Sequence, residues 1–110
     1  MSILRSDLLR GTLDLLVLKT LTTESMHGWG IAHRIQQLSG EVFEVQQGSI
    51  YPALLRLKRQ GWLTAEWRTS DHNRRARYYT LTALGRKQLQ EEERQWMLSS
   101  RAVDRLLRLA

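Results

Sequence analysis

The spacing of apolar residues changes twice along this chain, and that order restricts the folds open to it. In the first half, apolar residues recur at three- and four-residue intervals, which predicts helices at roughly 7–21 and 29–39 and a third that ends at Gly61. The interval then falls to two, which predicts two strands joined by a polar loop at 69–75. From Thr82, a suitable N-cap, a helical pattern returns. The sequence therefore predicts three helices, a hairpin and a long last helix.

Local signals mark the ends of the third predicted helix. It begins between Gln47 and Ser49, which places Pro52 in or near the first turn, where a missing backbone N–H costs little. Gly61 stands where a residue in the left-handed conformation commonly ends a helix. The preceding stretch, 41–47, alternates only weakly, so we interpret it as a connector or an edge strand.

Basic residues concentrate in the middle of the chain. There are 17 Lys and Arg against 11 Asp and Glu, a net charge of +6. The segment Arg56–Arg77 alone holds seven basic residues against Glu66 and Asp71. Such an excess favours a polyanionic partner. The alternative, that these side chains only keep a small domain in solution, is weakened by their position on the third helix and the hairpin.

The third predicted helix has two unlike faces. Ile50, Ala53 and Leu54, with Leu57 one turn later, recur at the spacing of one buried face. The opposite face is free to enter the major groove of DNA, which admits an α-helix. On this face lie the predicted DNA contacts Ser49, Tyr51, Pro52, Arg56 and Arg59.

The hairpin adds a cationic tip at 73–77, with Arg74, Arg75 and Arg77. Such a tip can follow the DNA backbone or enter a narrow minor groove. Helix, helix, helix, hairpin, helix is the order of a winged helix-turn-helix domain. We therefore predict a mainly α fold with a small β-hairpin, with residues 1–81 as the DNA-binding domain.

Residues 82–110 are predicted to form a dimerisation helix. Leu89, Trp96 and Val103 follow a seven-residue spacing, and Leu106 and Leu107 add to the same seam. A domain of this size could not cover that seam alone, so a second copy of the chain is the expected partner. Trp96 leaves two interpretations open: it stacks on a small aromatic effector, or it only packs the dimer.

Other functional classes find little support. The chain has no Cys, and His27, His33 and His72 are spaced too irregularly for a metal site. The consecutive acids Glu91–Glu93 point in different directions on a helix, so they form no catalytic pair. We therefore expect no enzyme activity and no cofactor. The longest apolar run, Leu15–Leu18, is four residues long. It is too short to span a membrane, and no secretion signal is evident, so we expect a cytoplasmic protein.

Three ordered groups of residues carry a family resemblance. They are Gly28 and Gly30 around Trp29, the run Gly48–Leu54 followed by Leu57 and Gly61–Leu63, and the run Arg74–Tyr79 followed by Leu81, Thr82 and Gly85. Together they resemble the short form of the PadR family of bacterial transcriptional regulators, over nearly the whole chain. Where the family commonly has Tyr, this chain has Trp29.

The resemblance implies a dimeric, DNA-binding repressor that occupies a palindromic operator and is released by a small molecule. By this resemblance, Ser49, Tyr51 and Pro52 correspond to the DNA-facing start of the recognition helix, and Arg77 and Tyr78 to contacts made by the hairpin. A different class also stays open, because the winged-helix fold serves protein contacts elsewhere: a protein-interaction or ligand-sensing module that does not read DNA.

Overall fold

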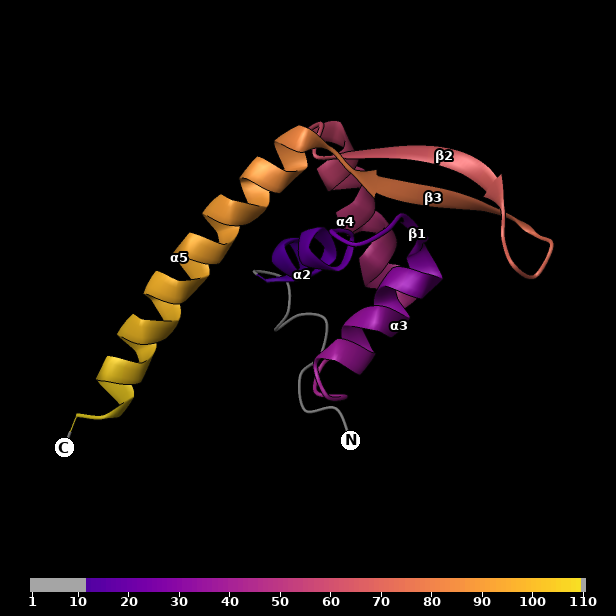
Figure 1. Cartoon of the computed structure of the whole chain (residues 1–110). Coiled ribbons are helices and arrows are strands. Elements are labelled where there is room, and N and C mark those ends of the chain that lie inside the picture. The colour runs from indigo at the N-terminus through magenta and orange to yellow at the C-terminus, as the bar shows by residue number, and fades with distance from the viewer. Residues whose placement is uncertain (1–11, 110) are drawn as a thin grey trace.

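A computed structural model describes residues 12–109 of the chain. The described part is mainly helical and carries one small antiparallel sheet (Figure 1). Its elements, in chain order, are α2 (Leu13–Thr20), β1 (Met26–His27), α3 (Gly28–Leu38), α4 (Gln47–Arg59), β2 (Leu63–Thr69), β3 (Arg75–Leu81) and α5 (Ala83–Leu107).

The predicted order of elements is confirmed. The second helix, the third helix, the hairpin and the last helix all begin and end close to the residues that the sequence indicates. Of the first predicted helix, 7–21, the portion before residue 12 lies outside the described residues. Of the stretch 41–47, the residues before Gln47 form a connector and not an edge strand. Gln47 is the first residue of α4.

The sheet has one strand more than the predicted hairpin. β2 and β3 pair in antiparallel register from Leu63 opposite Leu81 to Thr69 opposite Arg75. β1, two residues long, pairs with the other edge of β3 and gives the strand order β1-β3-β2. This short strand ties the hairpin to the start of α3. The hairpin, hereafter the wing, is therefore anchored on the helices at its base.

The core lies where α2, α3 and α4 meet the base of the wing. The side chains most completely removed from solvent come from all of these elements: Val17, Leu18, Ile31, Ile50, Leu54, Leu57 and Leu63. Full burial of one side chain of this size stabilises the folded state by about 1.5–3 kcal/mol. This shared core fixes how α4 is presented relative to the wing.

α4 ends in a hydrogen-bonded motif that turns the chain into β2. Gly61 has φ +80°, as predicted, and its N–H donates to the carbonyl of Lys58 at 3.0 Å. The N–H of Trp62 donates to the carbonyl of Leu57 at 3.1 Å, which completes a Schellman motif. Pro52 lies in the second turn of α4 rather than the first, on the exposed side. Water can therefore serve the carbonyl that its missing N–H leaves free.

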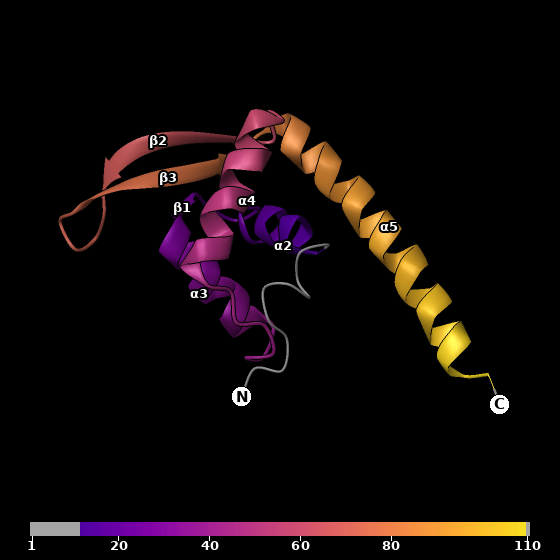
Figure 2. The ribbon, with the colours of Figure 1, turned by 180° about the vertical axis from the view of Figure 1, so that it is seen from behind.

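The wing and α5 leave the helical body in opposite directions (Figures 1 and 2). α5 begins at the predicted N-cap, where the Thr82 hydroxyl accepts a hydrogen bond from the N–H of Gly85 at 2.9 Å. α5 then passes over α2, and beyond that contact it projects away from the body, so the molecule measures 57 × 33 × 21 Å. Within the described part of the chain, none of the helices combines the length and apolar character that a bilayer span requires.

Candidate nucleic-acid interface

α4 has one face in the core and the other in solvent, as its sequence predicts. Ile50, Ala53, Leu54 and Leu57 have no exposed surface. The other predicted residues of this helix are outside that core: Tyr51, Pro52, Arg56 and Arg59 are exposed, and Ser49 is half-buried. The cationic side of α4 therefore faces outward, which is the geometry that a recognition helix needs.

Tyr51 lies where α4, α3 and the wing come together. Its ring packs against the first residue of α3, Gly28, where an added Cβ would lie only 2.8 Å from the Tyr51 Cε1 atom. Tyr79 of β3 is close enough to interact with Tyr51 electrostatically. Burial raises the pKa of the Tyr79 hydroxyl, and the Arg77 guanidinium opposes that shift. Gly28 thus leaves the space that the Tyr51 ring occupies.

Arg56 lies on the opposite flank of α4 from Tyr51. Five residues correspond to about 140° around a helix, so the two side chains do not point the same way. Arg56 Nη2 donates to Asp14 Oδ1 of α2 at 2.9 Å, and half of the Arg56 side chain stays exposed. The predicted α4 set is thus divided, with Tyr51 beside the wing and Arg56 held by α2.

Alternation along β3 divides the predicted wing residues as well. Arg75 and Arg77 share a face with buried Tyr79, while Tyr78 lies on the other face. We call the face with Arg75, Arg77 and Tyr79 the inner face. On it, the guanidinium carbons of Arg75 and Arg77 lie 5.5 and 5.8 Å from the ring centre of Trp67, the cross-strand partner of Arg77. Such cation–π contacts hold both guanidiniums in place.

The Tyr78 side chain packs against neighbours on the outer face of the sheet. Its ring meets the ring of His27 edge-on, with centroids 5.4 Å apart, and the Arg68 guanidinium lies 5.2 Å from its centre. Arg68 also pairs with Glu66. Arg77 and Tyr78 therefore face opposite sides of the wing, and the structure does not bring them into one site.

The turn at the end of the wing, residues 70–74, lies earlier in the chain than the predicted tip. Only Asn73 and Arg74 of the 73–77 segment lie outside the strands, because β3 already begins at Arg75. Asn73 has φ +59°, and its N–H donates to the Ser70 carbonyl at 2.9 Å. The Arg74 side chain is exposed at this turn. The cationic character of the tip thus comes from one turn residue and from strand residues behind it.

A groove of about 730 Å³ separates the inner face of the wing from the starts of α3 and α4. Aromatic and cationic side chains line it, and its described lining contains no Asp or Glu. The lining includes the predicted residues Tyr51, Arg74, Arg75 and Arg77, together with His27, Trp29 and Trp67, which were not predicted. Trp67 could have been found from sequence only with the strand register, which sets it opposite Arg77.

His27 both lines the groove and caps the start of α3. It is the N-cap of that helix, and its Nδ1 accepts a hydrogen bond from the N–H of Gly30 at 3.0 Å. Trp29, next to it, stacks on His33 with ring centres 5.1 Å apart and planes 7° from parallel. No three His, Asp or Glu side chains gather around a common point in the region covered by the structure.

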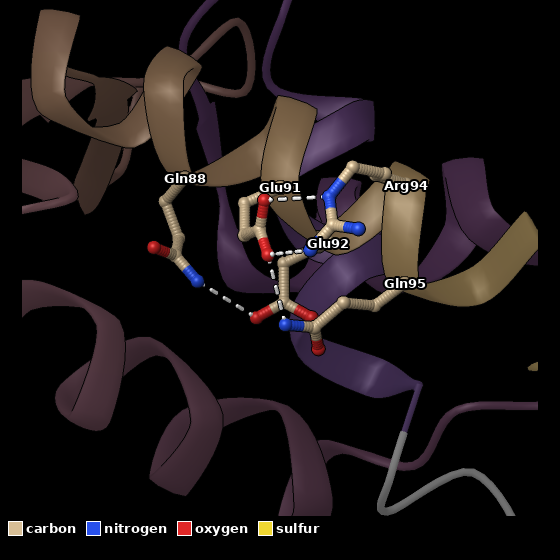
Figure 3. A network of polar contacts seen from close by, with 5 residues as sticks. All are labelled: Gln88, Glu91, Glu92, Arg94 and Gln95. Carbon is tan, nitrogen blue, oxygen red and sulfur yellow. Dashed lines mark hydrogen bonds and ion pairs between the residues drawn. The ribbon is translucent and has the colours of Figure 1, made fainter. Parts of the chain in front are cut away.

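The predicted seam of α5 is covered at one end and open at the other. Leu89 lies in the core of its own chain, so it does not share the exposed surface that was predicted for it. Trp96, Val103, Leu106 and Leu107 are all exposed. Between the covered and the open part of the seam, α5 also carries a polar network, with Arg94 and Gln95 donating to Glu91 and Gln88 donating to Glu92 (Figure 3).

Comparison with known proteins identifies relatives of this architecture. Residues 17–91 match the Transcriptional regulator PadR-like family. A transcriptional regulator of Mycobacterium tuberculosis is 35% identical over 85 residues, which are 77% of this chain and 76% of that protein. A solved PadR family transcriptional regulator from Eggerthella lenta is 31% identical, with a TM-score of 0.77 over 94% of this chain and 88% of that one. A transcriptional regulator from Clostridium thermocellum, 23% identical, shares the fold with a TM-score of 0.81 over 90% of this chain and 96% of that one.

Proposed function

The chain belongs to the PadR-like family of transcriptional regulators, and on that premise we propose that it is a sequence-specific repressor that occupies an inverted-repeat operator as a homodimer. Family membership makes it a DNA-binding transcription regulator and not an enzyme. The observation that carries the finer proposal is the division of α4, whose apolar side is fully buried while its polar side faces outward beside a cationic wing.

In this proposal, Ser49, Tyr51 and Pro52 enter the major groove at the start of α4. Arg74, Arg75 and Arg77 hold the flanking backbone, where guanidiniums bind phosphates well. Tyr78 would act from the outer face of the wing, and Arg59 from the end of α4. Arg56 would reach a phosphate by exchanging it for the Asp14 carboxylate. That exchange is inexpensive, because an exposed ion pair contributes only about 0–1 kcal/mol.

A second copy of the chain would provide the second half-site. A single recognition helix contacts few base pairs, and two-fold symmetry places two such helices about 34–36 Å apart on DNA. The exposed part of the α5 seam, from Trp96 to Leu107, is the surface we assign to that pairing. We propose that such a dimer acts in the cytoplasm, where DNA is available to it.

We further propose that a small aromatic effector can release the DNA. A ligand stacked on Trp96 between the two copies would rotate the α5 helices and change the spacing of the two DNA-binding domains. This version fails for a given set of aromatic ligands if they change neither the fluorescence of Trp96 nor the operator affinity. A dimer in which Trp96 serves only packing would then remain.

Footprinting on the promoter of the chain's own operon tests the DNA-binding proposal. We expect protection of an inverted repeat, with Arg75→Ala and Arg77→Ala each weakening binding. Each lost phosphate contact should also reduce the slope of log affinity against log salt by about 1.

Arg101→Ala, on α5 and away from the wing, is the matched control for charge. It removes the same charge and should leave operator affinity almost unchanged. Equal affinities for all three variants would mean that the wing does not touch DNA and would contradict the proposal.

A further inference from the structure

Three aromatic side chains that face the wing groove are unusually open to solvent. Trp29 is 61% exposed, Tyr51 50% and Trp67 57%. They come from three different elements, α3, α4 and β2, so the fold brings them together. Large apolar side chains gathered at one exposed site commonly mark a surface that binds a partner or a ligand, and aromatic rings at such a site can stack on a flat ligand.

The same groove carries positive charge that suits a negatively charged ligand. Arg74, Arg75 and Arg77 line it, and its described lining has no carboxylate to neutralise them. The Nε atom of Arg77 is buried, and it has no hydrogen-bond partner in the structure. A buried donor without a partner is costly, so an acceptor supplied by a ligand would be favourable at this point.

We propose that the wing groove binds a mononucleotide, with the base stacked on the exposed aromatic side chains and the phosphate on Arg75 and Arg77. Stacking of a base on an aromatic side chain is favourable and tolerates any base, because every base has a π-face. Guanidiniums match the geometry of phosphate oxygens. A groove of 730 Å³ also falls within the range of about 300–1,000 Å³ that is usual for small-molecule sites.

Duplex DNA would use only part of this chemistry. In a double helix the faces of the bases are covered by their neighbours, and a protein meets only base edges, sugars and phosphates. Phosphates of a duplex could reach Arg75 and Arg77, but Trp29 and Trp67 would find no base face to stack on. A free nucleotide offers both parts at once, which is why it is the occupant that fits the whole groove.

Nucleotide and operator would exclude one another, since both need Arg75 and Arg77. This consequence rests on the proposed function, whereas binding of the nucleotide itself does not. A binding test on the protein without DNA therefore distinguishes failure of the nucleotide site from failure of the proposed DNA-binding function.

Isothermal titration calorimetry on the full chain tests the site with three probes: adenosine 5′-monophosphate, adenosine, and ribose 5-phosphate. We expect the complete nucleotide to bind at least about tenfold more tightly than either part, since only the complete nucleotide combines stacking with charged hydrogen bonds. Equal binding of ribose 5-phosphate would reduce the groove to a phosphate site, and equal binding of adenosine would leave the arginines without a role. Either result, or no binding of the nucleotide, would overturn the proposal.

Matched variants locate the binding. Arg77→Gln should weaken nucleotide binding by about tenfold or more, and Arg101→Gln, which removes the same charge on α5, by less than about twofold. If Arg77→Gln perturbs the fold by circular dichroism, Arg75→Gln replaces it, because the Arg75 side chain is exposed. Equal affinities of the groove variant and the α5 variant would place the nucleotide elsewhere and reject this site.

Discussion

Gly85 makes one of the closest backbone contacts of the molecule. It lies in the first turn of α5, and a Cβ added there would be 2.2 Å from the carbonyl oxygen of Trp62 and 2.6 Å from Leu81 Cδ1. A backbone oxygen cannot move away as a flexible side chain can. The absence of a side chain at this residue is therefore what lets α5 begin directly against the turn after α4.

We expect Gly85→Ala to lower the free energy of unfolding by about 1–3 kcal/mol through overpacking. Helix propensity alone predicts the opposite sign, since Ala is favoured over Gly by about 1 kcal/mol inside helices. Gly48→Ala, in α4 with no atom within 4 Å of the added Cβ, is the control and should stabilise slightly. Urea unfolding of both variants measures the difference. A stabilised Gly85→Ala chain would show that α5 does not start so close to Trp62.

Glu91 is the residue whose titration is displaced most clearly. Hydrogen bonds from Arg94 and Gln95 lower the pKa of its carboxyl to about 2. Because the pKa is lower in the folded chain, the stabilisation is present above the ordinary value of 4.5 and disappears as the pH falls towards 2. NMR titration of the carboxyl carbon should show this, and Arg94→Gln should return the pKa towards its ordinary value. An unchanged midpoint in that variant would contradict the assigned cause.

At the scale of single elements, one hydroxyl joins two of them. Thr82 Oγ1 donates to the carbonyl of Gly61 at 2.7 Å and accepts from the N–H of Gly85 at 2.9 Å. It therefore caps α5 and also fastens that cap to the end of α4. We expect Thr82→Ala to destabilise the fold by about 0.5–2 kcal/mol, while Thr82→Ser retains most of the stability. Thermal unfolding compares them, and equal losses in both variants would mean that the methyl group, not the hydroxyl, matters.

The elements that repeat could be predicted from the sequence, and the contacts between them could not. The face of α4 with Ile50 and Leu54 follows from spacing along one helix, so it is correct residue by residue. β1 has only two residues and therefore no period to detect. The Arg56–Asp14 pair joins positions 42 residues apart, and nothing in the local pattern indicates it.

Leu89 and Trp96 show the same limit within one helix. They share one heptad seam in the sequence, yet Leu89 is buried and Trp96 exposed. The difference arises because α2 covers only the first part of α5. Periodicity identifies a face of a helix, whereas the length over which that face is covered depends on the tertiary arrangement.

For the whole molecule, the open part of the α5 seam decides the oligomeric state that we propose. We expect Val103→Glu with Leu107→Glu to shift a dimer to a monomer in light scattering, because two buried charges would oppose each other across the seam. Operator affinity should fall by at least about tenfold, since each copy then holds one half-site. Leu98→Glu, about 160° around the helix from Trp96, is the control. A double variant that remains dimeric would place the dimer contact elsewhere.

α5 extends well beyond the last described ion pair that joins it to the helical body, and this affects how the helix folds. Lys19 of α2 pairs with Glu93 at 3.5 Å, before the midpoint of the helix, and the side chains that follow are exposed except for half-buried Ser100. An isolated helix of fewer than about 12–15 residues is barely stable in water. At low concentration, where the chain would be present as single copies, the distal half of α5 would therefore fray. Ordering of that half and encounter with a second copy would then be one thermodynamic event, and the rigidity of the arm would rise with the abundance of the protein.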